Sequence, residues 1–427
     1  MRFQKNNTLE KYKNYISKDI GLLFFHIGIF LLFSAPSFGG LFILISIFIK
    51  KDLTKKIFYK DFFNYPLLIV SLLMLLSCLL FSLKLDVTSA ELNYKLFTNP
   101  YIGLINWIPF FFLFSRLESF LFNTELRKYA GFFLICSLIP VLLSGFSQEF
   151  LHVYGSMKAF NGLIIWYQRP NTSGMTGLFN NQNYTGCVIG SLLPLAVYFF
   201  YSSRKKFLTL FPTFLILISS VIGIILTNSR NAWLSIPLVF CLLIFHKIKK
   251  INLFFFTTGC SIAFLFNLFP LENKYIENLQ FINIIKDPRI QIYSEAISYI
   301  KERPFFGWGG NGFASIWNLD QSKNYFFAHS HNIFLEFSIQ YGLISAVIIS
   351  SLIIYIFYLS FKNLYLSSSE KKIKDIFFEK AWFTSSFIVI CSNFFDLPYY
   401  DIRISTLFWI LITGIKVIAK NEINYGL

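Results

Sequence analysis

The chain has 427 residues, of which 55% are hydrophobic and only 14% charged, with a formal net charge of +16 at pH 7. Soluble domains carry about a quarter charged residues, so this composition excludes a soluble fold and indicates helices that cross a lipid bilayer. The positive charges form short clusters beside apolar stretches, which favours anionic lipid head groups over nucleic acid as their partners.

Apolar stretches recur along the whole chain. We predict twelve transmembrane helices, at residues 20–33, 38–49, 66–83, 100–114, 130–147, 185–201, 207–227, 231–245, 252–270, 331–359, 381–395 and 404–415. With the N-terminus in the cytoplasm, 26 of the 38 Lys and Arg residues fall in cytoplasmic connections. This asymmetry predicts a multi-pass protein of the plasma (inner) membrane with both termini cytoplasmic.

No linker or change of composition divides the chain, so residues 1–427 are expected to form a single all-α integral membrane domain. The opening residues lack the pattern of a cleavable signal, and the first span is therefore expected to stay as an anchor. All six cysteines lie in predicted spans, where a thiol behaves as a small hydrophobic group, and no disulfide framework is indicated.

The longest polar connection, residues 271–330, is expected to be a large extracytoplasmic loop between the ninth and tenth spans. Within it, Asp287 and Pro288 predict the start of a helix, because Asp is a good N-cap and Pro suits the first helical position. Apolar residues then repeat at helical spacing until Pro304. The glycine-rich run at 305–313 permits backbone turns but by itself indicates no particular chemistry.

Two histidines precede the tenth span on the predicted extracytoplasmic side, in the sequence His329, Ser330, His331, Asn332. Histidine exchanges protons near neutral pH, and a neighbouring Asn can orient an imidazole or a sugar hydroxyl. A metal site is the competing interpretation, since two histidines in this spacing are a common ligand pair. Its third ligand would be Asp396 or Asp401. A pair of interfacial histidines without a catalytic part is the third interpretation.

Arginines on the same predicted side could bind an anion. Arg230 is the one ionisable group in the tight connection between the seventh and eighth spans, and it could also be an interfacial anchor. Arg289 lies in the first turn of the predicted loop helix, where free amides favour an anion, although it could instead pair with a lipid phosphate or a local carboxylate. Arg169 lies in a longer loop. These cations and the histidines fit a lipid-linked pyrophosphate sugar as substrate.

These residues resemble the O-antigen ligase and O-antigen polymerase superfamily of bacterial membrane glycosyltransferases. The resemblance extends from about Asn171 to Leu411. It depends on five motifs in order: GLFNNQNYTG at 177–186, TNSRNAW at 227–233, DPRIQIYSEAISYIKERPFFGWGGNGF at 287–313, HSHNIFLEFSIQYG at 329–342 and DLPYYDIRIS at 396–405.

The resemblance implies a fold similar to the GT-C class and a transfer that uses no metal and no cofactor. The donor would be a glycan on a polyprenyl-pyrophosphate carrier, and the acceptor a hydroxyl at the outer face of the membrane. The implied site residues are His331 as the base with His329 as a second candidate, Arg230, Arg289 and Arg169 on the pyrophosphate, and Asn332 and Asn183 for positioning substrate. The family often has Arg just before the Thr-Gly of the first motif; here Gly174 and Met175 stand there.

Ligases and polymerases of this superfamily differ in whether the acceptor is a glycolipid core, another lipid-linked glycan or a protein. The motifs favour a ligase, with a polymerase as the alternative. A transporter of polysaccharide precursors is the alternative from another class, as is a scaffold of an envelope-assembly complex. Transport needs polar groups along a path near the bilayer midplane, whereas the predicted spans are nearly free of charge and the polar groups gather at one surface.

Overall fold

The computed structural model describes residues 8–50, 61–82, 99–168, 174–204, 207–244, 288–319, 328–366 and 375–423. The predicted ninth span, 252–270, and Arg169 lie outside these residues, as does the part of the 271–330 loop before residue 288.

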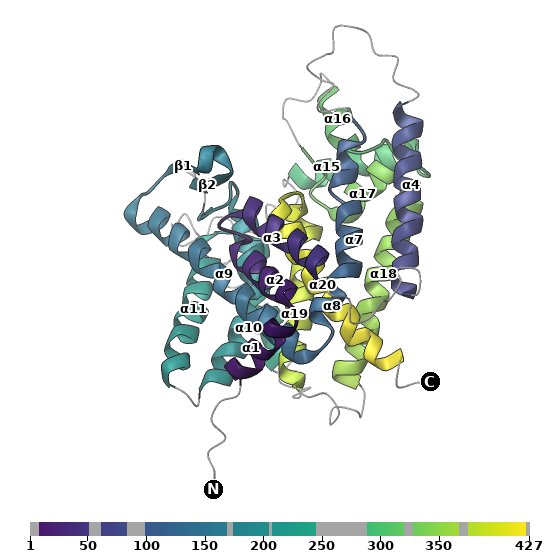
Figure 1. Cartoon of the computed structure of the whole chain (residues 1–427). Helices are drawn as coiled ribbons and strands as arrows, with labels where there is room; N and C mark the ends of the chain where they lie inside the picture. The colour runs from purple at the N-terminus through teal and green to yellow at the C-terminus, as the bar shows by residue number, and fades with distance from the viewer. Residues whose placement is uncertain are drawn as a thin grey trace.

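The described chain is mostly helical (Figure 1). Its first half contains α1 (Thr8–Lys18), α2 (Ile20–Leu31), α3 (Pro36–Ile49), α4 (Tyr65–Ser82), α6 (Ile102–Ile105), α7 (Ile108–Arg116), α8 (Glu118–Leu121), α9 (Thr124–Leu151), α10 (Gln182–Ser203) and α11 (Phe207–Leu226). Its second half contains α12 (Arg230–Trp233), α13 (Ser235–Val239), α15 (Pro288–Glu302), α16 (Gly312–Leu319), α17 (Ile333–Tyr341), α18 (Leu343–Phe361), α19 (Ile376–Phe395) and α20 (Ile402–Ile423). Short 3₁₀ or π turns flank these helices: η2 (Phe62–Asn64), η4 (Phe160–Gly162), η5 (Phe240–Ile244), η8 (Lys362–Leu366) and η10 (Pro398–Tyr400).

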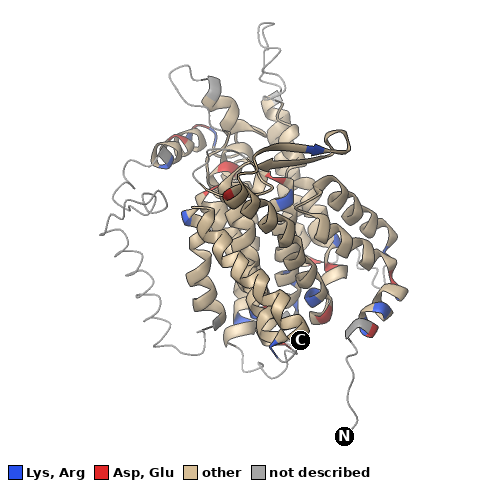
Figure 2. Cartoon of the chain, turned by 90° about the vertical axis from the view of Figure 1, so that its left-hand side faces the viewer, with Lys and Arg blue, Asp and Glu red and all other residues tan. Residues whose placement is uncertain are grey.

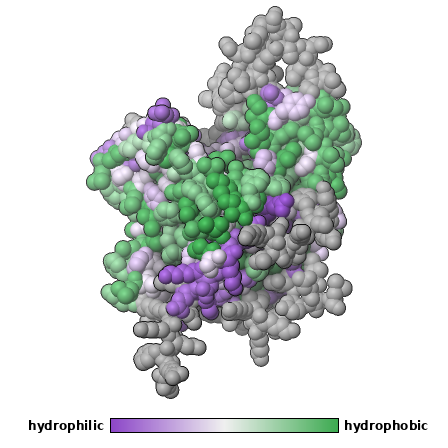
Figure 3. Space-filling model, in the orientation of Figure 1, coloured by the Kyte–Doolittle hydropathy of each residue, from purple (hydrophilic) through white to green (hydrophobic). Residues whose placement is uncertain are grey.

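Six helices of the described part are long and apolar enough to cross a membrane: Phe62–Phe81, Thr124–Leu151, Gln182–Ser203, Phe207–Leu226, Leu343–Leu366 and Ile402–Lys420. Shorter apolar helices cover Ile20–Leu31, Pro36–Ile49, Ile102–Arg116 and Arg230–Leu243. Apolar side chains cover the middle of the surface in Figure 3. A helical membrane protein is therefore confirmed, while the number of twelve spans and the likeness to the GT-C class stay predictions.

A β-hairpin departs from the all-α prediction. Strands β1 (Gly155–Ala159) and β2 (Ile164–Gln168) pair antiparallel in the connection after α9, with Gly155 opposite Gln168. The hairpin turn has positive φ at Phe160 (+50°), Asn161 (+53°) and Gly162 (+90°), and Asn and Gly are the residue types among these that tolerate it. The connection carries no strong alternation of apolar and polar residues, so the sequence analysis did not predict strands there.

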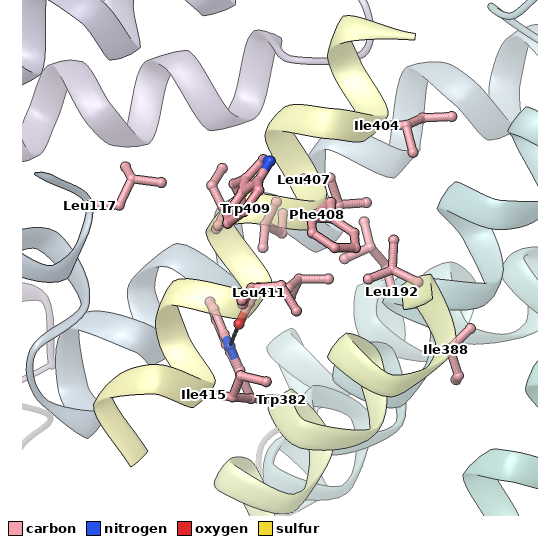
Figure 4. Packing of buried hydrophobic residues seen from close by; sticks show 14 of the residues in the cluster. Leu117, Leu192, Trp382, Ile388, Ile404, Leu407, Phe408, Trp409, Leu411 and Ile415 are labelled. Carbon is pink, nitrogen blue, oxygen red and sulfur yellow. Dashed lines mark hydrogen bonds between the residues drawn. The ribbon is translucent and has the colours of Figure 1, made fainter. Parts of the chain in front are cut away.

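Helix α20 forms the centre of the bundle, packed against α7, α18 and α19. The apolar part of this helix is 94% buried. Trp382 of α19 donates a hydrogen bond from its indole Nε1 to the Leu411 carbonyl, 3.0 Å away (Figure 4). A Cβ at Gly414 would lie only 2.1 Å from that indole nitrogen. Glycine therefore lets α19 and α20 approach closely, which is how small residues act between membrane helices.

The two ends of the bundle differ in what they carry. We call the end with residues 328–332 and 396–401 the site end, and the end with the first turns of α9 and α19 the far end. Helices α1 and α8 and the last turn of α20 also lie at the far end (Figure 1). Charged residues gather toward the helix ends in Figure 2, with the middle of the bundle mostly uncharged.

The prediction of one unbroken tenth span at 331–359 is wrong, because the helix breaks at Gly342, between α17 and α18. Gly342 has φ +85°, a backbone conformation that other residues rarely adopt. A Cβ there would also lie 1.9 Å from the Phe305 carbonyl oxygen. The glycine-rich run thus packs its backbone directly on the junction of the two helices.

That run also satisfies the carbonyl groups that the break exposes. Trp308 donates its N–H to Ile339 O at 2.8 Å, and Gly309 donates to Gln340 O at 2.9 Å. The last carbonyls of a helix lack partners within the helix and need such donors when buried. The glycine motif is therefore explained by close packing that fixes the loop helix α15 beside α17.

Candidate active site

The histidine motif forms a tight turn that leads into α17. Asn332 is the N-cap of that helix: its Oδ1 accepts from the N–H groups of Phe334 at 3.0 Å and Leu335 at 3.1 Å. Its Nδ2 donates to Phe394 O at 3.0 Å, near the end of α19. Asn332 thus joins the histidine turn to α19, and its predicted role in positioning substrate stays a prediction.

His331 is held against Asp396, which directly follows α19. The imidazole Nδ1 lies 2.9 Å from Asp396 Oδ1. The carboxyl side chain is only 3% exposed, whereas the imidazole is 23% exposed. Burial raises the pKa of Asp396, but the hydrogen bond from His331 and the two nearby imidazoles outweigh it and lower the pKa to about 2. Asp396 is therefore a carboxylate at neutral pH.

This pairing assigns different tasks to the two nitrogens of His331. A carboxylate can only accept, so Nδ1 carries the proton that is donated to Asp396. In the neutral imidazole Nε2 then has the free lone pair. General-base catalysis by histidine uses this arrangement: the carboxylate fixes the tautomer of the imidazole, and the free nitrogen of the imidazole accepts a proton.

His329 lies beside His331 with the ring centroids 4.4 Å apart. Its Nδ1 accepts the N–H of His331 at 3.3 Å. Burial, together with the charges of His331 and Arg289, lowers the pKa of His329 to about 4. His329 is therefore neutral at pH 7 and supports the backbone of its neighbour.

Helix α15 brings Arg289 to the histidine pair. It packs against α17, with Ile292 and Ala296 buried in a cluster that includes Ile339. Tyr293, one turn after Arg289, places its hydroxyl 3.4 Å from His331 O. Arg289 lies one helical turn before Tyr293 and is one of the charges that lower the pKa of His329. The predicted helix after Pro288 is confirmed.

Helix α12, which begins with Arg230, packs against the end of α19 just before Asp396. Asn231 donates from Nδ2 to Ser392 O at 3.0 Å. The same carbonyl accepts the N–H of Asp396 at 3.2 Å, one turn later along the chain. Arg230 itself is exposed and starts α12, which Ser229 caps through the N–H of Ala232. Arg230 and Arg289 therefore both begin helices at the site end.

The first motif of the resemblance, 177–186, is fixed by an arginine that the sequence analysis did not single out. Arg403 is 6% exposed, donates to Leu178 O at 3.0 Å and stacks on the Phe179 ring at 3.9 Å. Its guanidinium also makes a two-pronged bond to Asp401, with Nε 2.8 Å from Oδ1. Arg403 thus holds the motif against α20.

Asn183 lies in the first turn of α10, where its backbone N–H is accepted by Oδ1 of the N-cap residue Asn181 at 2.8 Å. Its predicted role in positioning substrate is not tested by any contact. The structure brings together His329, His331 and Arg289, places the helix of Arg230 beside Asp396, and leaves Arg169 outside the described residues.

Asp396 is the residue whose role the sequence analysis missed, because it was considered only as a metal ligand. It stands 65 positions after His331, with α17, α18 and α19 between them. The available signal was its place in the DLPYYDIRIS motif at the end of a predicted span. The spacing of residues along the chain does not show that Asp396, and not another acidic residue, is the partner of His331.

A metal ion is the alternative use of these groups. Ligand atoms of His329, His331 and Asp396 all lie within 4.8 Å of one another. Two ligands of one tetrahedral zinc ion stand about 3.3 Å apart, given bonds of about 2.0 Å. The 2.9 Å between His331 Nδ1 and Asp396 Oδ1 is shorter than that and suits a hydrogen bond. An ion held through both His331 Nδ1 and Asp396 Oδ1 would have to separate this pair.

Comparison with known proteins gives a family for part of the chain. Residues 213–350 match a family described as O-Antigen ligase. Over 142 residues the chain is 29% identical to the ComP-specific O-oligosaccharyltransferase of Acinetobacter baylyi (strain ATCC 33305 / BD413 / ADP1). That match covers 30% of this chain and 26% of the relative, so it spans about a quarter of the relative's length.

The matched family segment includes Arg230, Arg289, His329 and His331, and it ends before Asp396. These findings confirm the resemblance to the O-antigen ligase superfamily.

Proposed function

We propose that this member of the O-antigen ligase superfamily transfers a glycan from a polyprenyl-pyrophosphate carrier to an acceptor hydroxyl at the outer face of the plasma membrane. The observation that supports it most is the hydrogen-bonded pair of His331 and Asp396, 2.9 Å apart, with the arginine-bearing helices α12 and α15 beside it. The pair provides a base, and the arginines provide sites for an anionic leaving group.

In the proposed reaction His331 Nε2 removes the proton of the acceptor hydroxyl as that oxygen attacks the anomeric carbon of the donor glycan. A new glycosidic bond forms while the bond from the anomeric carbon to the pyrophosphate oxygen breaks. The bonding electrons leave with the pyrophosphate. Asp396 stabilises the imidazolium that forms, as a buried carboxylate next to a histidine does in other enzymes.

Arg289 and Arg230 neutralise the departing polyprenyl pyrophosphate in this proposal. A guanidinium offers paired donors that match phosphate oxygens, and such charge stabilisation supplies a large part of the rate of phosphate-leaving reactions. Two guanidinium groups would take the part that a divalent cation has in other enzymes acting on pyrophosphates. The proposed transfer is therefore independent of a metal.

Three kinds of molecule could provide the acceptor hydroxyl. The motifs favour a ligase that acts on a glycolipid, with a polymerase as the alternative. The name of the relative, an O-oligosaccharyltransferase specific for ComP, favours a third candidate, transfer to a hydroxyl of a protein. Deleting the gene separates the three: a ligase mutant loses attachment of chains of normal length, a polymerase mutant keeps single repeat units, and a protein-directed mutant loses glycoprotein only.

The direct test uses the purified protein in lipid with a lipid-linked glycan donor. His331→Ala should reduce the rate of transfer by about 10²- to 10⁴-fold, which is the range for losing a general base. His152→Ala is the matched control, because His152 is exposed at the same end of the bundle, next to the hairpin. Full activity of a correctly inserted His331→Ala variant would end the proposal.

A further inference from the structure

Glu336 is a buried carboxyl group one turn into α17, behind the histidine turn. It is 1% exposed, and in the described part of the chain it makes no ion pair. Donors from three different segments surround it. Its Oε2 accepts the Ser330 N–H at 2.7 Å, and its Oε1 accepts from Gln340 Nε2 at 2.7 Å and from the Tyr400 hydroxyl at 3.3 Å.

The first of these bonds fixes the histidine turn itself. Ser330 is fully buried between the two histidines, and its N–H reaches no other acceptor than Glu336 among the described residues. The next residue, His331, has φ +56°, a left-handed conformation that costs energy for a residue with a Cβ. Such a conformation persists only where surrounding bonds determine it. Glu336 supplies one of those bonds directly before the strained residue.

The bond to Tyr400 reaches the segment that carries Asp396. Tyr400 ends the 3₁₀ turn η10, which begins two residues after Asp396. Glu336 is therefore connected to both partners of the pair: to His331 through Ser330, and to Asp396 through Tyr400 and η10. Its neighbour Gln340 anchors the opposite side, since its carbonyl accepts from Ser77 of α4 at 2.9 Å.

We propose that Glu336 is a positioning residue that holds His331 in register with Asp396, an inference that rests on the proposed function of that pair. The carboxyl group acts only as a hydrogen-bond acceptor here. Because the side chain is only 1% exposed, the proposal gives it no part in moving the proton of the acceptor hydroxyl.

Two substitutions separate this role from proton transfer. Glu336→Leu keeps much of the volume but leaves the Ser330 N–H without an acceptor. We expect the kcat of transfer to fall by about 10- to 100-fold with KM little changed, because a displacement of about 1 Å at a reacting group can cost 10²-fold.

Glu336→Gln should keep kcat within about three-fold of the wild type and leave the dependence of kcat on pH unchanged. The new amide oxygen can accept from Ser330, and the new amide N–H₂ can donate to Gln340 Oε1 once the Gln340 amide turns over. Turning the amide over takes Gln340 Nε2 away from the Tyr400 hydroxyl, to which it donates at 2.5 Å, but Gln340 Oε1, which has no partner among the described residues, can then accept from that hydroxyl. Amides turn in this way without a change in shape.

Glu302→Leu is the matched control, since Glu302 is exposed at the end of α15. If Glu336→Leu does not accumulate in the membrane, Tyr400→Phe provides the measurement. It removes the hydroxyl that bonds Glu336 and Gln340, leaves the bond between Glu336 and Ser330 in place, and should reduce kcat by about three- to ten-fold. An unchanged kcat in that variant would contradict the inference.

The inference is overturned if folded Glu336→Leu transfers glycan at the wild-type rate. It is also overturned if folded Glu336→Gln is as inactive as His331→Ala, because Glu336 would then move a proton. Failure of the proposed function looks different: His331→Ala itself would retain full transfer, whatever the Glu336 variants do.

Discussion

The two ends of the bundle hold buried charges in different ways. At the far end, Arg and Lys side chains meet carboxylates. Arg127 is 2% exposed and donates to Glu379 of α19, with Nε 3.1 Å from Oε2. Lys416 is fully buried, with its Nζ 2.7 Å from Asp61 and 2.9 Å from Glu118. At the site end the buried carboxylate of Asp396 meets an imidazole instead.

The difference separates a structural use of charge from a chemical one. A guanidinium keeps its proton in a folded protein, so the pair of Arg127 and Glu379 joins two helices that are distant in sequence and does not change its charge. An imidazole can gain or lose a proton near neutral pH. The pair of His331 and Asp396 can therefore change its charge during a reaction, which the pair of Arg127 and Glu379 cannot. Substitutions at each end should accordingly affect different measurements.

The largest effect is expected for the far end. Glu379→Gln leaves Arg127 buried without its counter-charge and should lower the free energy of unfolding by about 3–5 kcal/mol, since breaking one side of a buried pair has that cost. The transfer rate per folded molecule should stay unchanged. Lys128→Gln is the control: Lys128 pairs with Asp375 at 2.9 Å but is 24% exposed, so less than about 1 kcal/mol should be lost. Thermal unfolding in detergent measures both.

The second effect belongs to the site end. Asp396→Asn should reduce kcat by on the order of 10²-fold, because the amide no longer fixes the tautomer of His331 or stabilises its charged form. The matched variant Asp375→Asn at the far end removes the acceptor of Lys128 and Tyr198 and should leave kcat intact. Equal losses of kcat in the two variants would show that the comparison between the ends is wrong.

The smallest effect concerns the pH dependence of transfer. The pKa of His329 is lowered to about 4, below its usual value of 6.5, so the group stays neutral in the folded protein until the pH approaches 4. Asp396, with a pKa of about 2, stays charged over the same interval. Replacing His329 by Gln should therefore leave the shape of the rate profile between pH 5 and 7 unchanged, although the absolute rate can fall. If the profile changes shape in this variant, the dependence of the rate on pH in this interval comes from His329.

Much of the fold followed from local sequence. The helices after Pro288 and at 130–147, 185–201 and 207–227 were predicted because apolar periodicity, N-capping residues and proline act over a few neighbouring residues. Asn332 is predicted to position substrate, but an Asn directly before an apolar helix is also a good N-cap. In the structure Asn332 is the N-cap of α17. The break at Gly342 was not predicted, because it is fixed by close packing and hydrogen bonds to the distant segment 304–309.

Amino-acid order and hydropathy are enough to predict a helical membrane protein, to name the residues that could exchange a proton or bind an anion, and to show that these residues cluster in a few motifs. Which of these residues meet depends on the folded bundle. Asp396 contacts His331 across 65 residues, and Glu336 links that pair through Ser330 and Tyr400. Hydropathy and capping depend on neighbours in the chain, whereas these contacts depend on how α15, α17 and α19 pack, and that packing is set by side-chain shape over the whole bundle.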